Sequence, residues 1–276
     1  PADGLTQAMT TSFRMAGVAK AELFADGNLR AARSRVDPLF QAARQAGRLH
    51  YPYRDFVQFY DYPRPGVLHF NMTRINRVNG LSPEDLTRAE TEGRRQAAVL
   101  SEWLVREVPA FRSAWIEKLA CHAGVRETRH VKGLYTFSHE DVAAGRKFDD
   151  AIARSRYFID IHSPTGPGFD HEVPGAKGAV RASYAPPPND WYEVPYRCIV
   201  PVGLANLLVP CRAFSATHEG AAAVRVMATM TALGQAAGLA AARAATTRSS
   251  VAEINAVALR RELGYLDAPP ELGEPW

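Results

Sequence analysis

The stretch of the sequence best suited to chemistry is "NLLVPCRAFSATHEGAAAVRVMATMTALGQAAGLAAA", residues 206–242. It predicts a short apolar strand at Asn206–Val209, a polar turn, and then a long helix of small residues with almost no charge. Small side chains allow close approach to the backbone, and a helix N-terminus carries partial positive charge. The N–H groups of Val226–Thr229 therefore suit an anionic or electron-rich ligand. The alternative is a buried structural helix, in which Gly234 and Gly238 allow another element to pack close.

Composition indicates a globular protein around this stretch. The chain has 276 residues, 46% of them hydrophobic, which is enough for one large domain or two interleaved ones. The net charge of +4 comes from scattered arginines, which argues against nucleic-acid binding. No apolar run reaches the length of a membrane span. The three cysteines lack framework spacing and predict reduced thiols. Residues 1–276 contain no recognisable signal peptide or targeting segment, and the start at Pro1 indicates a processed chain or a part of something longer. We expect a cytoplasmic protein.

The first part of the chain predicts mixed α/β structure. Gly4–Val18 alternates enough for a strand that ends at Gly17. Residues 20–47 are rich in Ala and Arg and predict a helix at least from Asp37-Pro38 onward, with proline in the first turn. Asp55–Ile75 alternates like a strand and is interrupted by two prolines, which favours a hairpin in an edge position.

The middle of the chain contains two helix starts. Ser82, Pro83 and two acidic residues predict the N-terminus of a long amphipathic helix. Val125–Phe137 predicts paired strands turning near Gly133, followed by Ser138 and Asp141 as the cap of a short helix. Residues 163–195 are rich in Pro and Gly and predict a long surface loop.

Several longer motifs resemble one family in their order along the chain. They are "GVRETR", "EDVAAGRKFDDAIARS", "IDIHSP", "YEVPYRCIVPVGLANLLV" and "SATHEGAAAVRVMATMTALGQAAG". The chain resembles the FAD-dependent oxidoreductases among the glutathione-reductase-like flavoproteins, from about Gly66 through Ala242. The resemblance implies a flavin domain interleaved with a substrate domain and FAD as the cofactor. It also implies that the strand at Asn206–Val209 and the helix from about Ala228 close the flavin site, with the pyrimidine end of the isoalloxazine at the helix start.

The sequence departs from this family in two places. The glycine-rich turn G-x-G-x-x-G, which cradles the ADP half of FAD in the family, occurs nowhere in the chain. The chain therefore looks like the C-terminal part of such an enzyme. We expect a second polypeptide to supply the ADP-binding half, the alternatives being a cleaved N-terminal fragment or further residues of the same protein. Where the family has "AGR" after the closing strand, this sequence has Pro210, Cys211 and Arg212. Proline removes an N–H donor there, and cysteine adds a side chain where glycine permits close approach.

The resemblance assigns the candidate site residues. The catalytic candidates are His218, Arg197 and His162. His218 is expected to act as an acid or base, the alternative being a histidine that bonds loop backbone. Arg197 is expected beside the substrate, the alternative being a structural ion pair. His162 ends an alternating strand and is expected to face the same cavity. None belongs to a zinc motif.

The cofactor-binding candidates lie before the small-residue helix and in its first turn. They are Cys211, Arg212, Arg225, Val226, Met227, Ala228 and Thr229. Arg225 is a candidate partner for the cofactor or for Glu219. Cys211 is a candidate redox-active thiol, the alternative being a small buried side chain.

The resemblance implies a partial FAD/NAD(P)-binding flavoprotein fold of mixed α/β class. We expect a substrate domain with interleaved flavin-domain pieces at 1–200, the closing strand and helix of the flavin domain at 201–246, and a C-terminal helix and tail at 247–276. The expected reaction is hydride transfer from a small polar organic substrate to flavin. The alternative is a non-catalytic binding or assembly subunit that keeps the fold but has lost flavin.

Overall fold

The computed structural model describes residues 6–25, 27–49, 54–166, 172–173, 176–264 and 266. The chain divides into two compact units. The N-terminal unit comprises Ala2–Thr128 and His162–Gly168, and the C-terminal unit comprises Arg129–Ile161 and Phe169–Trp276. The class is mixed α/β, as predicted, and every strand pairing between the described strands is antiparallel. The two units do not show which residues belong to a substrate domain and which to a flavin domain, so that assignment stays a prediction.

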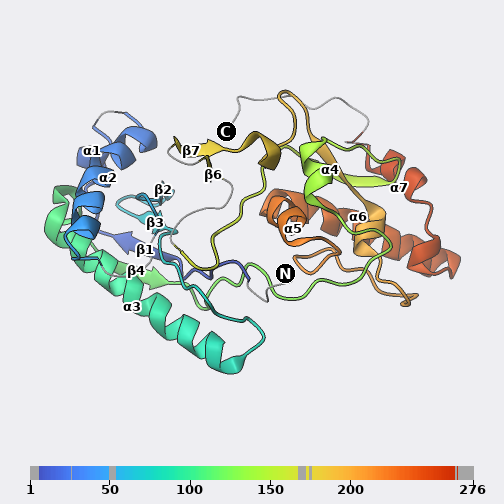
Figure 1. The fold of residues 1–276 in the computed structure, drawn as a ribbon, viewed down its shortest axis with the longest axis horizontal. Coiled ribbons are helices and arrows are strands. Elements are labelled where there is room, and N and C mark those ends of the chain that lie inside the picture. The colour runs from blue at the N-terminus through green and yellow to red at the C-terminus, as the bar shows by residue number, and fades with distance from the viewer. Residues whose placement is uncertain are drawn as a thin grey trace. The chain divides into compact units, whose positions relative to one another are not determined.

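The N-terminal unit is built on a four-stranded sheet in the order β2-β3-β1-β4 (Figure 1). Its strands are β1 Phe13–Ala16, β2 Phe59–Asp61, β3 Leu68–Phe70 and β4 Trp115–Leu119. Its helices are α1 Lys20–Leu23, α2 Leu29–Gln45 and α3 Pro83–Glu107, with a short 3₁₀ turn at Pro109–Phe111. One face of the sheet packs against apolar side chains of α2 and α3 in a common core. The hairpin predicted within Asp55–Ile75 is confirmed as β2 and β3, with β2 at the edge.

The predicted start of α3 is confirmed, and the helix predicted within residues 20–47 is present as α2, but the placement of Pro38 in its first turn is wrong. Ser82 accepts a hydrogen bond from the backbone N–H of Asp85 at 3.1 Å, and Pro83 opens α3. By contrast, α2 begins at Leu29, where Asn28 accepts from the N–H of Ala31 at 2.9 Å, so that Pro38 lies inside the helix. Pro38 is exposed, which leaves the carbonyl that it cannot bond accessible to water. The side-chain cap sets the start of this helix.

The strand predicted at the N-terminus is shorter than expected, and the pair predicted at Val125–Phe137 is absent. Residues 1–5 lie outside the described residues, and β1 covers only Phe13–Ala16 before Gly17, whose φ is +75°. The segment Val125–Phe137 forms isolated bridges instead of strands. Its backbone bonds to a distant segment, as in the N–H of Leu134 to Val200 O at 3.0 Å. The expected strand partner was local, whereas the actual one lies far along the sequence.

The C-terminal unit contains two two-stranded sheets, β5-β8 and β6-β7, together with the helices that Figure 1 labels α4 to α7. Its strands are β5 Ala151–Ser155, β6 Glu172–Val173, β7 Ala176–Val180 and β8 Tyr192–Pro195. Its helices are α4 His139–Ala143, α5 His218–Val224, α6 Met227–Thr247 and α7 Ala256–Leu263, with 3₁₀ turns at Ala182–Tyr184, Tyr196–Ile199 and Val251–Glu253. The cap predicted for α4 is confirmed, because Asp141 Oδ2 accepts from the N–H of Ser138 at 2.9 Å.

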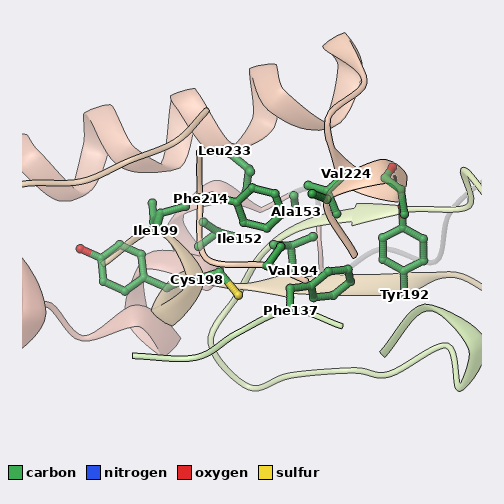
Figure 2. Packing of buried hydrophobic residues seen from close by; sticks show 14 of the residues in the cluster. Phe137, Ile152, Ala153, Tyr192, Val194, Cys198, Ile199, Phe214, Val224 and Leu233 are labelled. Carbon is green, nitrogen blue, oxygen red and sulfur yellow. Dashed lines mark hydrogen bonds between the residues drawn. The ribbon is translucent and has the colours of Figure 1, made fainter. Parts of the chain in front are cut away.

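The core of this unit joins β5 and β8 to α5 and α6. Phe214, Val194 and Leu233 meet beneath α6 in Figure 2, and all three are fully buried. Tyr192 spans this core and donates a hydrogen bond to Ala223 O at 3.1 Å. The burial of its ring raises the pKa of the Tyr192 hydroxyl well above its usual value. The chemistry-bearing segment at 206–242 therefore packs on a continuous apolar core.

Two predictions for this unit are wrong. The loop expected at 163–195 contains β8, whose four residues are all buried in the pairing with β5, and also β6 and β7; residues 167–171 and 174–175 lie outside the described ones. The closing strand expected at Asn206–Val209 is irregular chain, with Leu207 43% exposed. Leu208 packs against the core of this unit, and among the described residues the N–H of Val209 donates to Ile199 O at 2.8 Å, but the segment pairs with no described strand.

No helix among the described residues has both the length and the apolar character required to cross a membrane. The tail predicted after the C-terminal helix lies outside the described residues from 267 onward.

Candidate functional site

His218 is the first residue of α5 and is half-buried. The preceding Thr217 caps the helix, because its hydroxyl accepts from the N–H of Gly220 at 3.1 Å. The N–H of Thr217 donates to Phe137 O at 2.8 Å, which ties the helix start to the segment before α4. The imidazole of His218 is therefore carried by a fixed helix terminus instead of by the polar turn expected from the sequence.

Gly220 allows α5 to approach the backbone at Phe137. A Cβ added at Gly220 would lie 2.4 Å from the carbonyl oxygen of Phe137 and 2.9 Å from its carbonyl carbon. Backbone atoms cannot move aside as the end of a flexible side chain can. The glycine after "THE" is therefore required by packing.

We expect Gly220→Ala to lower the free energy of unfolding by about 1–3 kcal/mol, the usual cost of overpacking. The matched control is Gly234→Ala in α6, where an added Cβ would meet nothing within 4 Å. There the better helix propensity of alanine is expected to leave stability equal or slightly higher. Urea unfolding of both variants checks this, and equal stabilities would show that α5 can shift without cost.

The corner between α5 and α6 is held by Arg225. Its guanidinium donates to Asp160 O at 2.9 Å and lies 3.4 Å from Asp160 Oδ2. The hydroxyl of Tyr157 donates to the same Oδ2 at 3.2 Å. Arg225 thus forms its ion pair with Asp160 and not with Glu219, which the sequence had suggested as a partner.

The first turn of α6 is open to solvent. The helix begins at Met227, in agreement with the start expected near Ala228, and it runs for 21 residues. Val226 is its N-cap but forms no side-chain cap hydrogen bond. Met227 is 87% exposed and Ala228 is also exposed, whereas Thr229 is buried at 4%. The result is an accessible helix terminus with partial positive charge.

The residues after position 209 differ in their access to solvent. Cys211 and Arg212 are both exposed, in a turn closed by the N–H of Phe214 to Cys211 O at 2.8 Å. Cys198 is the buried thiol of this unit, and burial raises its pKa far above the usual value. Cys211 is therefore not the small buried side chain that was its alternative, and a redox role for it stays a prediction.

Arg197 lies in a separate surface cleft of the C-terminal unit. Its Nε and one terminal nitrogen bond to the two carboxylate oxygens of Asp150 at 2.8 and 3.1 Å. Its guanidinium also lies 5.3 Å from the ring centre of Tyr135. The cleft has a volume of about 540 Å³ and includes Tyr196, whose hydroxyl donates to Val251 O at 2.7 Å and whose pKa is raised by burial to about 12.

The pairing of Arg197 with Asp150 could not be found from the sequence, because the two residues are 47 positions apart. The structural ion pair considered as the alternative is present, so Arg197 carries a matched charge. Its role toward a substrate stays a prediction.

His162 belongs to the N-terminal unit, unlike His218 and Arg197. It is buried at 4%, and its backbone N–H donates to Gln7 Oε1 at 3.4 Å. Gln7 is itself buried and donates from its backbone N–H to Glu127 Oε2 at 3.4 Å. The surroundings of His162 thus form a buried polar cluster with Gln7 and Glu127.

Comparison with known proteins identifies one family. The family model described as FAD dependent oxidoreductase matches residues 2–263. No curated protein and no solved structure matches the chain.

Proposed function

The chain belongs to the FAD-dependent oxidoreductase family, and we propose that its C-terminal unit forms the isoalloxazine end of a flavin site for hydride transfer from a small polar organic substrate. The observation that carries this proposal is the open first turn of α6, in a chain that matches the family over residues 2–263.

The residues at this turn fit the electron-rich end of a flavin. Met227 and Ala228 leave the helix start accessible, and Val226 makes no side-chain cap hydrogen bond that would compete for its N–H groups. An added Cβ at Gly234 or Gly238 would also meet nothing within 4 Å, so the small-residue face of α6 is open. Arg225 fixes the turn through Asp160. Partial positive charge at this position stabilises negative charge on a bound group.

FAD, when bound, accepts the hydride. The role that we assign to this chain is to hold and move the associated proton. His218, fixed at the start of α5, is placed to take a hydroxyl proton from the substrate as general base. The positive charge of Arg197 is balanced by the carboxylate of Asp150. The guanidinium therefore offers oriented hydrogen-bond donors, while the pair as a whole carries no net charge.

We assign the ADP half of FAD to residues outside 1–276, in a second polypeptide or in another part of the same protein, because residues 1–276 contain no glycine-rich dinucleotide turn.

We expect Ala228→Asp to weaken flavin binding about ten-fold or more, because it places a negative charge at the end of α6 that faces the ring. The same carboxylate favours the helix itself, since acidic side chains stabilise a helix N-terminus. Flavin content and dissociation constant, measured by absorbance, are therefore expected to fall while the melting temperature holds or rises.

The matched control is Ala242→Asp, at an exposed position of the same helix far from its first turn. It is expected to leave flavin binding unchanged. Equal flavin affinity of wild type and Ala228→Asp would place the flavin elsewhere and overturn the proposal.

A further inference from the structure

A row of cationic and aromatic side chains crosses the sheet of the N-terminal unit. In the strand register Tyr60 on β2 stands opposite His69 on β3, His69 opposite Arg14 on β1, and Arg14 opposite Lys118 on β4. We call Tyr60, His69, Arg14 and Lys118 the cross-strand row. The neighbouring Phe13 and Phe70 are buried in the core with α2 and α3, so the row belongs to the opposite face of the sheet.

The charges in this row are not matched. Among the described residues, none forms an ion pair or a side-chain hydrogen bond with Arg14, His69 or Lys118. The guanidinium of Arg14 lies 4.1 Å from the centre of the Tyr62 ring, and the ring of His69 lies beside that of Tyr60. Like charges directly opposite each other on neighbouring strands destabilise a sheet. Arg14 and Lys118 stand in this arrangement, which the fold alone does not explain.

The two nearest carboxylates are engaged elsewhere. Asp61 at the end of β2 pairs with Lys20 at 2.6 Å. Glu117 pairs with Arg64, and it occupies the irregularity in β4 between the partners of Arg14 and Met15. A bulge of this kind re-aims side chains and is often found beside binding sites. Here it adds an acidic residue to β4 without giving the row a counter-charge.

We propose that the cross-strand row is a binding site for a small polyvalent oxyanion, a molecule that carries two or more carboxylate or phosphate groups. The guanidinium of Arg14 and the ammonium of Lys118 hold its charged oxygens, and Tyr60 and Tyr62 cover its less polar part. The proposal is independent of the flavin site in the C-terminal unit.

Charge and dimensions together favour a small anion. The two charged members, Arg14 and Lys118, lie on the adjacent strands β1 and β4, and strands are about 4.8 Å apart. His69 extends the row to β3, so the row from His69 to Lys118 is only about 10 Å wide. Two or three anionic groups suffice to match it. A nucleic acid chain needs a cationic groove that follows many phosphates, and the sequence has a net charge of only +4.

Calorimetric titration of the protein at fixed ionic strength tests the proposal, with pyrophosphate as the phosphate probe and tricarballylate as the carboxylate probe. We expect saturable binding of at least one probe, and the preferred probe identifies the chemical source. Lys118→Gln is expected to weaken binding about ten-fold or more, as loss of a charge-assisted hydrogen bond does. The control Lys132→Gln removes an exposed lysine of the C-terminal unit and is expected to change nothing.

Two further readouts separate a binding role from a structural one. Without anion, Lys118→Gln is expected to keep or raise the melting temperature by about 1–3 °C, because it relieves like-charge repulsion. Burial and the charge of Arg14 lower the pKa of His69, so a bound anion is expected to raise that pKa in an NMR titration, with His69→Gln identifying the resonance.

Three results would overturn the proposal. They are no binding of either probe, equal binding by wild type and Lys118→Gln, and tighter binding of a single-stranded oligonucleotide than of pyrophosphate at equal phosphate concentration. A lower melting temperature of Lys118→Gln, with probe affinity intact, would assign the row to the fold.

Discussion

Replacement of His218 by alanine is expected to lower turnover by about 100- to 10,000-fold, the range contributed by a positioned acid or base. Alanine is a good helix former, and the cap of α5 comes from Thr217, so the helix start survives the change. Flavin content is therefore expected to stay near that of the wild type. The measurement is the rate of flavin bleaching in stopped flow, with the best donor from a panel of small alcohols.

His139→Ala provides the matched control. His139 is also the first residue of a capped helix in the same unit, and its imidazole bonds to Ser183 O. Its replacement is expected to leave the bleaching rate unchanged. Unchanged bleaching in His218→Ala would assign proton transfer to another group, and loss of flavin would make His218 a cofactor or structural contact.

Replacement of Arg260 by alanine is expected to lower the free energy of unfolding by about 3–5 kcal/mol, since it leaves a buried carboxylate without its counter-charge. Arg260 on α7 bonds to both oxygens of Glu193 on β8, at 2.9 and 3.1 Å, and Glu193 is only 2% exposed. The same guanidinium donates to Phe148 O at 2.7 Å. The side chain of Arg260 thus links α7 to strand β8 of the C-terminal unit.

Arg261→Ala is the matched control for this prediction. Arg261 is the next residue of α7 and is exposed, so its removal should cost no more than about 0.5 kcal/mol. Denaturant unfolding followed by tryptophan fluorescence measures both. If the two variants unfold at the same denaturant concentration, the pair of Arg260 and Glu193 does not fasten α7.

Local signals in the sequence predicted some helix starts well. The caps at Ser82 and Ser138 act within one turn, so spacing alone was sufficient to place α3 and α4. Pro38 does not mark the first turn of α2, because an exposed proline is tolerated inside the helix once Asn28 has set its start. The match of the family model to residues 2–263 confirmed the resemblance.

Features that depend on distant pairing could not be predicted. Val125–Phe137 and Asn206–Val209 were predicted as strands, but the backbone hydrogen bonds of both segments go to distant parts of the chain and form no strand pair. The residues that form a site also depend on distant pairing. The contact of Arg197 with Asp150 depends on the tertiary fold, and the cross-strand row depends on a register that no spacing reveals. By contrast, the open start of α6 follows from a local run of small residues, which is why it was expected.

The central proposal is that this chain contributes the isoalloxazine end of a flavin site whose ADP half lies outside residues 1–276. Native mass spectrometry of the protein, isolated gently from its source with its visible absorbance recorded, tests this proposal most directly. The account predicts a yellow protein that carries one FAD for each copy of the chain, and the measured mass shows which polypeptide supplies the ADP-binding half. A colourless, stable protein without FAD would contradict it.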